Sequence, residues 1–363
     1  MRKFYMADFL KLNPNILLTE KCNQSCSYCF AKKKMEETAK KEMSADDIRK
    51  IVGFLEKNGQ DEIKLMGGEP TLHSQFKEII DFILSRGFKI KLFTNSLFSK
   101  DLAEWLSRKG GSINYSVNLS TPAFGTEAGR SAIARNLNLF NDSRIEASVT
   151  IDSLEFEPSS LIEFVKNNNI QSVKFGVANK LIGDKNWLPF EQYKNFSFLI
   201  YSLIKKLKEE INVNTITFNC GFTPCMFEQG QIDYFLKKKV RINGWGCAGK
   251  WGSFDISADL NIFPCFVLKD LGGRNIFAFK DLRAADKFVK NLLKYAIYKS
   301  PLSTFEFCKK CLYYKHYKNL KCFGPCLGYV INNLNGQKLF EDLLNAPRYK
   351  IINRLLYTFR NWV

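Results

Sequence analysis

Between residues 15 and 177 the sequence alternates short apolar runs with amphipathic stretches of helical length, and this alternation constrains the fold most. The apolar runs predict six strands: Ile16–Thr19, Ile63–Met66, Ile90–Thr94, Ile113–Leu119, Ile145–Ile151 and Ser172–Val177. The stretches between them predict helices over Ala45–Asn58, Gln75–Arg86, Lys100–Lys109 and Leu161–Asn168. Strands that alternate with helices of roughly 10–15 residues build parallel βαβ units. Six units form an open doubly wound sheet or an incomplete (β/α) barrel, with the functional groups at the carboxyl ends of the strands.

The rest of the chain divides into three further regions after a first domain over residues 1–180. Residues 181–219 predict a bridging helix, Phe190–Glu210, and a strand, Thr215–Asn219. Residues 220–330 contain eight cysteines and few long helical patterns, which is typical of a domain held together by metal more than by a large core. Residues 331–363 predict a helical tail, broken at Pro347, whose last helix is amphipathic. That helix packs on its own barrel or touches a membrane surface, and we prefer the first interpretation.

Composition excludes several classes of protein. With 363 residues, 45% hydrophobic and 14% aromatic, the chain can bury a core, so it is neither disordered nor collagen-like. No apolar run approaches the roughly 18 residues of a membrane helix. Asp8, Lys11 and Pro14 interrupt the N-terminal stretch, so it is not a signal peptide. We therefore expect a cytoplasmic protein with no membrane partner.

The net charge of +18 is uneven along the chain. Residues 287–363 carry fourteen basic and three acidic side chains. A basic surface attracts nucleic acid, acidic peptides or phosphorylated ligands. The alternative, which we prefer slightly, is that the excess reflects only the composition of a chain rich in Lys, Asn, Ile and Phe.

The eleven cysteines are clustered. Three lie within residues 22–29 and the other eight follow position 219. An odd count and the absence of an export signal argue against disulfides. Thiolates grouped in this way are typical of zinc or iron–sulfur sites. Cys22, Cys26 and Cys29 form a C-x3-C-x2-C loop after the first predicted strand, and three thiolates can hold three corners of a cubane cluster.

The loop from Cys22 to Phe30 resembles the signature of the radical S-adenosylmethionine (SAM) enzymes. The resemblance implies that Cys22, Cys26 and Cys29 bind a [4Fe-4S] cluster whose open iron chelates SAM, with Tyr28 and Phe30 near the adenine. The sequence Gly67-Gly68-Glu69-Pro70, at the end of the second predicted strand, resembles the family's GGE-P motif. Glycines allow close backbone approach and a carboxylate stabilises the methionine ammonium of SAM. Without the triad, these four residues would be an ordinary strand-to-helix turn.

Weaker matches follow along the chain. Thr94-Asn95-Ser96 ends the third predicted strand, where the family often has Thr-Asn-Gly. Ser116, Asn118 and Ser120 share one face of the fourth strand, so they contact the SAM ribose or carboxylate or else cap turns. Other candidates are apolar walls for adenine or plain core: Val149, Ile151 and Val177. His73 occupies a position that is often His in the family, and we interpret it as structural.

The eight distal cysteines resemble the SPASM auxiliary-cluster domain, which follows the barrel in radical SAM enzymes that modify peptides and proteins. They are Cys220, Cys225, Cys247, Cys265, Cys308, Cys311, Cys322 and Cys326, and the stretch before Cys265 predicts a hairpin. Eight thiolates suffice for two four-iron clusters. This chain departs from the family pattern in three ways: the hairpin turn lacks the usual Gly, the spacing from Cys311 to Cys322 is longer, and no cysteine follows Cys326. There are two alternatives to two auxiliary clusters. One is a single cluster in a shorter twitch domain, and the other is a zinc knuckle at Cys308–Cys326.

The resemblance implies an α/β fold class: a partial (β/α)6 TIM-like barrel, a small cysteine-rich auxiliary-cluster domain and a C-terminal helix. It implies an enzyme that cleaves SAM reductively to a 5′-deoxyadenosyl radical and removes hydrogen from a peptide or protein. The expected substrate is a ribosomally made precursor peptide that receives a crosslink, a thioether or an epimerised residue. A reductant such as flavodoxin or ferredoxin is then a partner. Because the first strand begins near the N-terminus, we expect no fused leader-binding domain, so a separate recognition protein or the basic C-terminal third binds the leader. The alternatives are modification of RNA or a small metabolite, and a zinc or iron–sulfur binding module.

Overall fold

The computed structural model describes residues 12–29, 31, 41–140, 144–178, 195–219, 221–242 and 254–293, with residues 308, 322, 326, 327 and 330. Within this part, the strands are β1 (Asn15–Thr19), β2 (Glu62–Gly67), β3 (Lys89–Thr94), β4 (Ile113–Asn118), β5 (Ile145–Ile151), β6 (Ser172–Val177), β7 (Thr215–Phe218), β8 (Arg241–Ile242), β9 (Asp255–Ile256), β10 (Asn261–Phe263) and β11 (Arg274–Asn275). The α-helices are α2 (Ala45–Lys57), α3 (Phe76–Ser85), α4 (Lys100–Ser107), α5 (Glu127–Leu137), α6 (Ser159–Asn167), α8 (Asn195–Glu209), α9 (Gln229–Lys237) and α10 (Leu282–Leu293).

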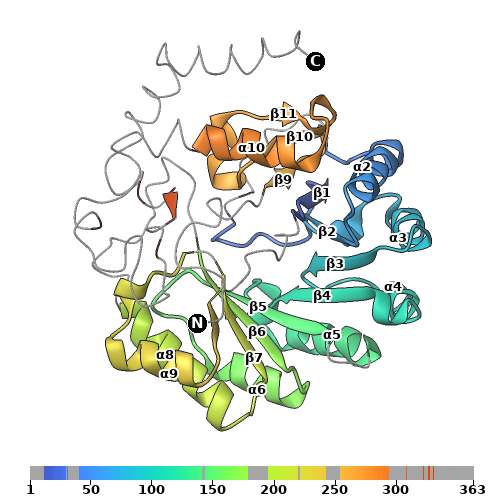
Figure 1. Cartoon of the computed structure of the whole chain (residues 1–363). Helices are drawn as coiled ribbons and strands as arrows, with labels where there is room; N and C mark the ends of the chain where they lie inside the picture. Colours follow the sequence, from blue (N-terminus) through green and yellow to red (C-terminus); the bar gives the residue numbers. More distant parts are fainter. Residues whose placement is uncertain are drawn as a thin grey trace, which may run out of the picture.

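These strands form one curved sheet in the order β11-β10-β9-β1-β2-β3-β4-β5-β6-β7-β8. Strands β1 to β8 are all parallel to their neighbours, and β9 adds to the other edge of β1 in parallel. The helices that connect the parallel strands lie along the outer side of the sheet (Figure 1). A doubly wound sheet would carry helices on both faces. The structure is therefore the partial barrel, and the predicted fold class is confirmed.

The six predicted strands are confirmed as β1 to β6, and the four predicted helices as α2, α3, α4 and α6. The long bridging helix corresponds to α8, although residues 190–194 lie outside the described part of the chain. The predicted strand after it is β7, which continues the barrel sheet beside β6. Strand β8 was not predicted, because two residues are too few to show an alternating pattern.

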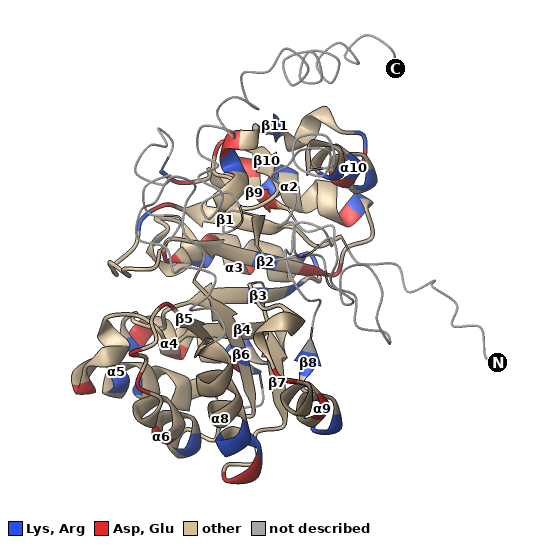
Figure 2. Cartoon of the chain, turned by 90° about the vertical axis from the view of Figure 1, so that its left-hand side faces the viewer, with Lys and Arg blue, Asp and Glu red and all other residues tan. Residues whose placement is uncertain are grey.

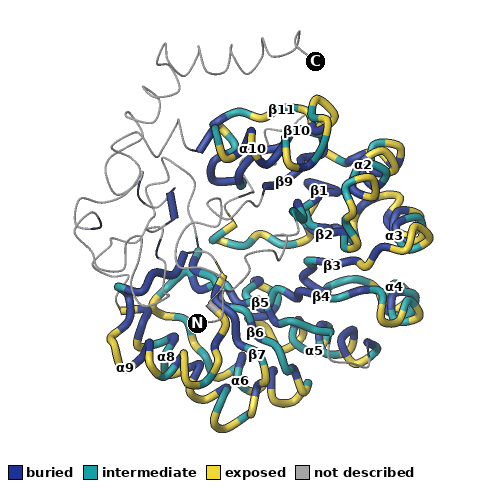
Figure 3. Tube along the Cα trace, viewed as in Figure 1, coloured by how far each residue is buried: buried dark blue, intermediate teal, exposed yellow. Residues whose placement is uncertain are grey.

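Alternation along the strands separates the two faces of the sheet. In β2, Ile63 and Leu65 are fully buried against the helices, while Lys64 and Met66 face the inner side, which we call the lumen. The strands are accordingly the most buried elements, and the helices are exposed on their outer faces (Figure 3). Lysine and arginine residues mark the outer helices, among them α8 and α9 (Figure 2). Ser44, Ser99 and Thr126 cap α2, α4 and α5 by accepting backbone N–H bonds, which fixes where these helices begin.

The predicted hairpin is present as β9 and β10, which pair antiparallel. Its turn runs from Ser257 to Leu260, and Leu260 takes the left-handed conformation with φ +68°. A Gly is the residue that adopts this conformation without strain, so the missing glycine is replaced here by a strained leucine. The hairpin sits on the edge of β1, so the sheet runs across the predicted boundaries at residues 180 and 219. The division into domains stays a prediction.

Helix α10 joins the C-terminal segment to the first helix of the barrel. The backbone N–H of Leu282 donates to Asn58 Oδ1 at the end of α2, and Phe277 packs edge-on against Phe54.

The predicted tail over residues 331–363 lies outside the described residues. Among the helices that are described, none is long and apolar enough to cross a membrane.

Candidate functional site

A cavity of about 580 Å³ lies at the carboxyl ends of the strands, where the fold class predicts a site. Cysteines and main-chain turns form one side of it, and inward-facing strand residues form the other. Its lining residues from the predicted site are Cys22, Cys26, Cys29, Tyr28, Gly67, Gly68, Glu69, Thr94, Asn95, Ser116 and Asn118. Pro70 and Ser120 lie outside the lining, and Phe30 is outside the described residues.

The three cysteines of the loop all face this cavity. Burial raises the pKa of the Cys22 thiol, with the Glu69 carboxylate and Cys29 adding to the shift. Burial likewise raises the pKa of Cys26, while a hydrogen bond with the Tyr28 hydroxyl lowers it. The Cys22 and Cys26 thiols are therefore protonated at neutral pH in the free chain, and positive charge from bound iron would be needed to hold them as thiolates.

The donor set of the loop fits an iron–sulfur cluster. Three thiols, of Cys22, Cys26 and Cys29, face one cavity. A cubane cluster spreads its thiolates over different corners, so these three could each ligate one iron.

Gly67 and Gly68 serve the chain's own packing. A Cβ at Gly67 would lie 2.2 Å from the Thr19 carbonyl oxygen, and one at Gly68 would lie 2.3 Å from that of Lys21. The Gly68 N–H donates to Thr19 O at 2.8 Å, and the Glu69 N–H donates to Lys21 O at 2.8 Å. The glycines thus let the end of β2 lie against the segment that leads into Cys22. The glycines were predicted to let the ligand approach the backbone closely. In the structure, the chain's own backbone at Thr19 and Lys21 makes this close approach.

Glu69 is 1% exposed and joins the ends of two strands. Its Oε1 accepts from the Thr71 hydroxyl at 2.8 Å and the Thr94 hydroxyl at 2.7 Å, and its Oε2 accepts from the Asn95 N–H at 2.7 Å. Burial raises the pKa of Glu69, and these donors oppose the shift. Oε2 has one partner among the described residues, so it retains capacity to accept from a cation in the cavity.

Asn95 connects β3 to the cysteine loop. Its Nδ2 donates to Asn23 Oδ1 at 2.6 Å, and Asn23 Nδ2 donates to the Leu97 carbonyl at 3.1 Å. The next residue, Ser96, has φ +59°, which explains why the family often has Gly at this position. Asn136 of α5 donates to the Ser96 carbonyl at 2.8 Å and so holds this turn.

The polar residues of β4 divide between the cavity and the barrel interior. Asn118 Nδ2 donates to the Tyr28 hydroxyl at 3.0 Å, which positions the tyrosine ring over the cavity. Ser120 Oγ instead accepts from the Thr150 N–H at 2.8 Å and joins β4 to β5. Ser116 lines the cavity, but its hydroxyl is bonded to Glu146 and Lys174 below. Val149, Ile151 and Val177 belong to the core between sheet and helices, as the simpler interpretation predicted.

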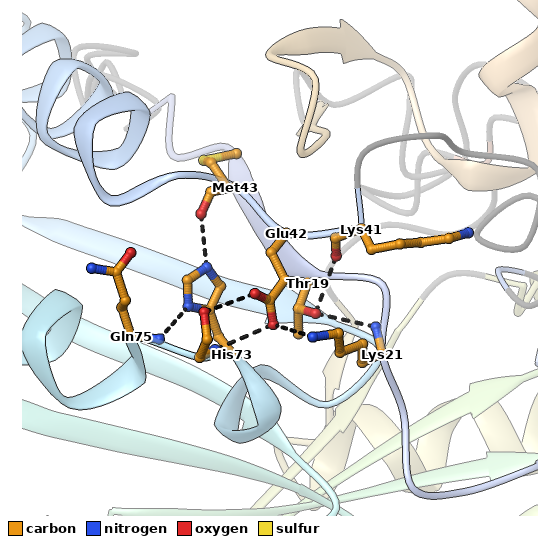
Figure 4. A network of polar contacts seen from close by, with 8 residues as sticks. Thr19, Lys21, Lys41, Glu42, Met43, His73 and Gln75 are labelled. Carbon is orange, nitrogen blue, oxygen red and sulfur yellow. Dashed lines mark hydrogen bonds and ion pairs between the residues drawn. The ribbon is translucent and has the colours of Figure 1, made fainter.

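Contacts of His73 and Glu42, which we call the clasp, join segment 41–43 to the turn after Glu69 and to the end of β1 (Figure 4). The segment 41–43, which follows the loop, crosses the end of β1 through a bridge between Thr19 and Glu42. His73 Nε2 donates to the Met43 carbonyl at 2.7 Å, and its Nδ1 accepts from the Gln75 N–H at 3.0 Å. Glu42 accepts from Lys21 Nζ at 3.0 Å and from the Ser74 hydroxyl at 2.8 Å. The hydrogen bonds of His73 to Met43 and Gln75 give it the structural role that was predicted. The role of Glu42 was not predicted.

Several lining residues were missed by the sequence argument. Ser148 and Thr150 alternate with Ala147 and Val149 along β5, so the rule applied to β4 would have found them. Met66 and Phe93 directly precede Gly67 and Thr94 and alternate along β2 and β3 in the same way. The remaining lining residues carry no such signal: Glu20, Lys21, Gln24, Ser25, Ala31, Lys41, Thr121 and Phe266.

The distal cysteines are only partly described. Cys308, Cys322 and Cys326 are each 7% exposed within the hydrophobic core cluster, and Cys225 and Cys265 are half-buried. Cys220, Cys247 and Cys311 lie outside the described residues. The auxiliary clusters therefore stay a prediction.

Comparison with known proteins finds a family match over most of the barrel. The family model for the radical SAM superfamily matches residues 16–154. A GTP 3′,8-cyclase from Mannheimia succiniciproducens is 34% identical over 125 residues, which are 33% of this chain and 35% of that protein. The chain thus spans about a third of the length of the curated relatives it matches.

Solved structures share the fold over more of the chain. Streptococcus suis SuiB bound to S-adenosylmethionine has a TM-score of 0.58 at 17% identity, covering 83% of this chain and 70% of that one. SuiB bound to its precursor peptide SuiA also has a TM-score of 0.58, at 18% identity over 80% of this chain and 68% of that one. The family model thus matches residues 16–154, and the solved structures share the fold of the chain.

Proposed function

We propose that this protein is a radical SAM enzyme that removes hydrogen from a carbon of a peptide or protein substrate. The observation that carries the proposal is that the C-x3-C-x2-C loop and the Gly67-Gly68-Glu69 turn line the same cavity, with Tyr28 between them and β4. These groups are the ones that the family uses to hold its cluster and SAM.

The residues present fit the cofactors. Cys22, Cys26 and Cys29 would ligate three irons of a [4Fe-4S] cluster, and Glu69 Oε2 would accept from the ammonium of SAM. When bound, the cluster would supply the electron for reductive cleavage of SAM. The protein's part is to orient the reactants and to exclude water.

The chain's own contacts make this site rigid. The clasp of His73 and Glu42 ties segment 41–43 to the turn that carries Glu69. The Asn95–Asn23 hydrogen bond ties the cysteine loop to the end of β3. Three elements that would each touch the cofactors are therefore held in one geometry before binding, which reduces the ordering cost of binding them.

Two observations support a peptide substrate. The distal cysteines resemble the auxiliary domain of peptide-modifying members, and Cys308, Cys322 and Cys326 are all buried in the core. SuiB, whose fold this chain shares, is bound to a precursor peptide in one solved structure. A flavodoxin or ferredoxin would be the reductant, and a separate protein could supply leader recognition.

A small-metabolite substrate is the second candidate. It is favoured by the similarity to GTP 3′,8-cyclases, which are named for a reaction on a nucleotide. The similarity covers about a third of each chain, so it supports the radical SAM domain more than the substrate.

Anaerobic reconstitution tests the proposal. The protein should bind close to twelve irons if all three clusters form, and should cleave SAM to 5′-deoxyadenosine under dithionite. Replacing Cys22, Cys26 and Cys29 by Ala should remove a third of the iron and all cleavage. Undiminished cleavage in this variant would defeat the assignment, and stoichiometric zinc with little iron would favour a binding module.

The substrate class is tested separately. Candidate precursor peptides and GTP are incubated with the reconstituted enzyme, and products are identified by mass spectrometry. A peptide that loses hydrogen supports the proposal, whereas a cyclised nucleotide would replace it with the metabolite alternative. Replacing Cys308 and Cys311 by Ala should abolish peptide product while SAM cleavage without substrate persists. Normal product formation would show that these cysteines have no part in the substrate step.

A further inference from the structure

Three lysines meet inside the half-barrel, directly below the cavity. Lys64 of β2 lies opposite Lys91 of β3 in the parallel register, so the two side chains share the lumen face. Lys174 of β6 reaches toward them from the other side and donates to Glu146 at 2.7 Å and to the Ser116 hydroxyl at 3.0 Å. We call Lys64, Lys91, Ser116, Glu146 and Lys174 the lumen cluster.

The lumen cluster has more positive than negative charge. Glu146 Oε1 accepts from both Lys174 and Lys91, so one carboxylate serves two ammonium groups. Lys64 has no ion pair within the described part of the chain, and its Nζ donates a long 3.4 Å hydrogen bond to the Asn13 carbonyl. Two further carboxylates act on Lys64 without an ion pair in the described residues: Glu62, which accepts from Asn13 at 3.0 Å, and Asp255, which accepts from Asn15 at 2.7 Å. An excess of buried ammonium groups is costly unless an anion compensates it.

The titration behaviour agrees with this charge balance. Burial lowers the pKa of Lys64 and Lys174, and the charge of Lys91 lowers both further. Burial raises the pKa of Glu146, but Lys174 and Lys91 outweigh it and bring the pKa down to about 2. Burial raises the pKa of Asp255 to about 7, so its negative charge is incomplete at neutral pH.

The lumen cluster is joined to the cavity by two residues. Ser116 belongs to the cluster and also lines the cavity. Phe93 lines the cavity too, and its ring lies over Lys174 at 5.1 Å and Lys91 at 5.7 Å. Lys64, Lys91 and Lys174 lie beneath the lining residues, so an anionic group would have to pass Phe93 to reach Lys91, whose side chain is 25% exposed.

We propose that the lumen cluster binds an anionic group of the substrate, a carboxylate or a phosphate. The proposal rests on the proposed function, since it treats the inner end of the cavity as the place of the substrate. The anion would accept from Lys91 and Lys64, while Glu146 keeps Lys174 and Ser116 in position. A substrate anchored there has its reacting carbon above it, toward the cysteine loop.

The test uses two probe anions on the full chain, inorganic pyrophosphate and glutarate, against chloride at matched ionic strength. Thermal unfolding and acetylation of each lysine, measured by mass spectrometry, report binding. Neither measurement needs the cluster or SAM, so failure here is distinguishable from failure of the proposed function. We expect at least one anion to protect Lys64 and Lys91 and to raise the Tm. Protection by pyrophosphate alone indicates a phosphate group, and protection by glutarate alone indicates a carboxylate.

Variants of opposite charge make the test specific. Lys91→Met should weaken anion binding at least about tenfold, which corresponds to about 1.4 kcal/mol. Glu146→Gln should instead tighten it, because the lumen gains positive charge. Lys89→Met is the matched control, since Lys89 lies on the same strand but is exposed. A Tm increase that is equal in the wild type and Lys91→Met, no protection by either anion, or weaker binding in Glu146→Gln would each overturn the proposal.

Discussion

Glu69 Oε2 accepts a hydrogen bond from the backbone N–H of Asn95 at 2.7 Å, which joins the end of β2 to the end of β3 at the wall of the cavity. The two residues belong to separate motifs in the sequence, GGEP and TNS. In the folded chain they are one unit, and Asn95 extends it to Asn23 of the cysteine loop. A change at Glu69 therefore acts on stability as well as on ligand binding.

Glu69→Gln and Glu69→Ala should differ in a way that separates these two effects. The glutamine keeps the size of the side chain but loses the charge that faces the SAM ammonium, so SAM affinity should fall about tenfold or more, as expected for a charge-assisted bond worth about 1.5–3 kcal/mol. The alanine also leaves the buried donors of Thr71, Thr94 and Asn95 unsatisfied, so its Tm should drop further. Iron content and SAM dissociation constants check the outcome. An unchanged dissociation constant in Glu69→Gln would leave Glu69 with a structural role alone.

His73 should control how firmly the cysteine loop is held. His73→Phe removes the donor to the buried Met43 carbonyl, which costs about 1–3 kcal/mol, while His73→Gln can keep a donor near the position of Nε2. We expect a lower Tm and faster iron loss to a chelator in His73→Phe, with partial rescue in His73→Gln. Equal iron loss in the wild type and both variants would show that the clasp does not hold the loop.

Ser96→Gly should stabilise the protein by about 0.5–1 kcal/mol. The φ of +59° is strained for serine, and the Ser96 hydroxyl is buried without a hydrogen-bond partner among the described residues. Ser96→Ala is the matched comparison, because it removes the hydroxyl but keeps the Cβ. Glycine should therefore be more stable than alanine in denaturant unfolding. A less stable glycine variant would show that unfolded-chain entropy outweighs the strain.

Asp255 should make the protein less stable as the pH rises from about 4 to about 7. Burial raises its pKa from 3.8 to about 7, so the folded state keeps a proton that the unfolded state has already lost. The stabilisation is complete below the unfolded pKa and is lost as the pH passes the folded pKa, a change on the order of 4 kcal/mol. Asp255→Asn should not show this loss. Unfolding free energies of both proteins across this pH range are the measurement, and parallel pH profiles would contradict the shift.

The sequence by itself determined the parallel α/β architecture and the residues that bear chemistry. Apolar alternation depends on local spacing, so strands β1 to β6 were predictable, and the lumen side of β4 followed from Ser116 and Asn118. The cysteine loop and the Gly67–Pro70 turn were recognisable because their chemistry needs fixed residue types at fixed spacing. The turn at Leu260 was predicted as unusual for the same reason.

Only the tertiary structure decided which of these residues meet. The contacts of Asn95 with Asn23 and of His73 with Met43 join segments far apart in the chain, and no local pattern encodes such pairs. The lumen cluster depends on strand register across β2 to β6, because a shift by one residue would turn Lys91 or Glu146 toward the helices. The register of the strands and the contacts between distant segments are set by the packing of the whole core. The sequence therefore indicated the chemistry of the site, and the fold supplied its geometry.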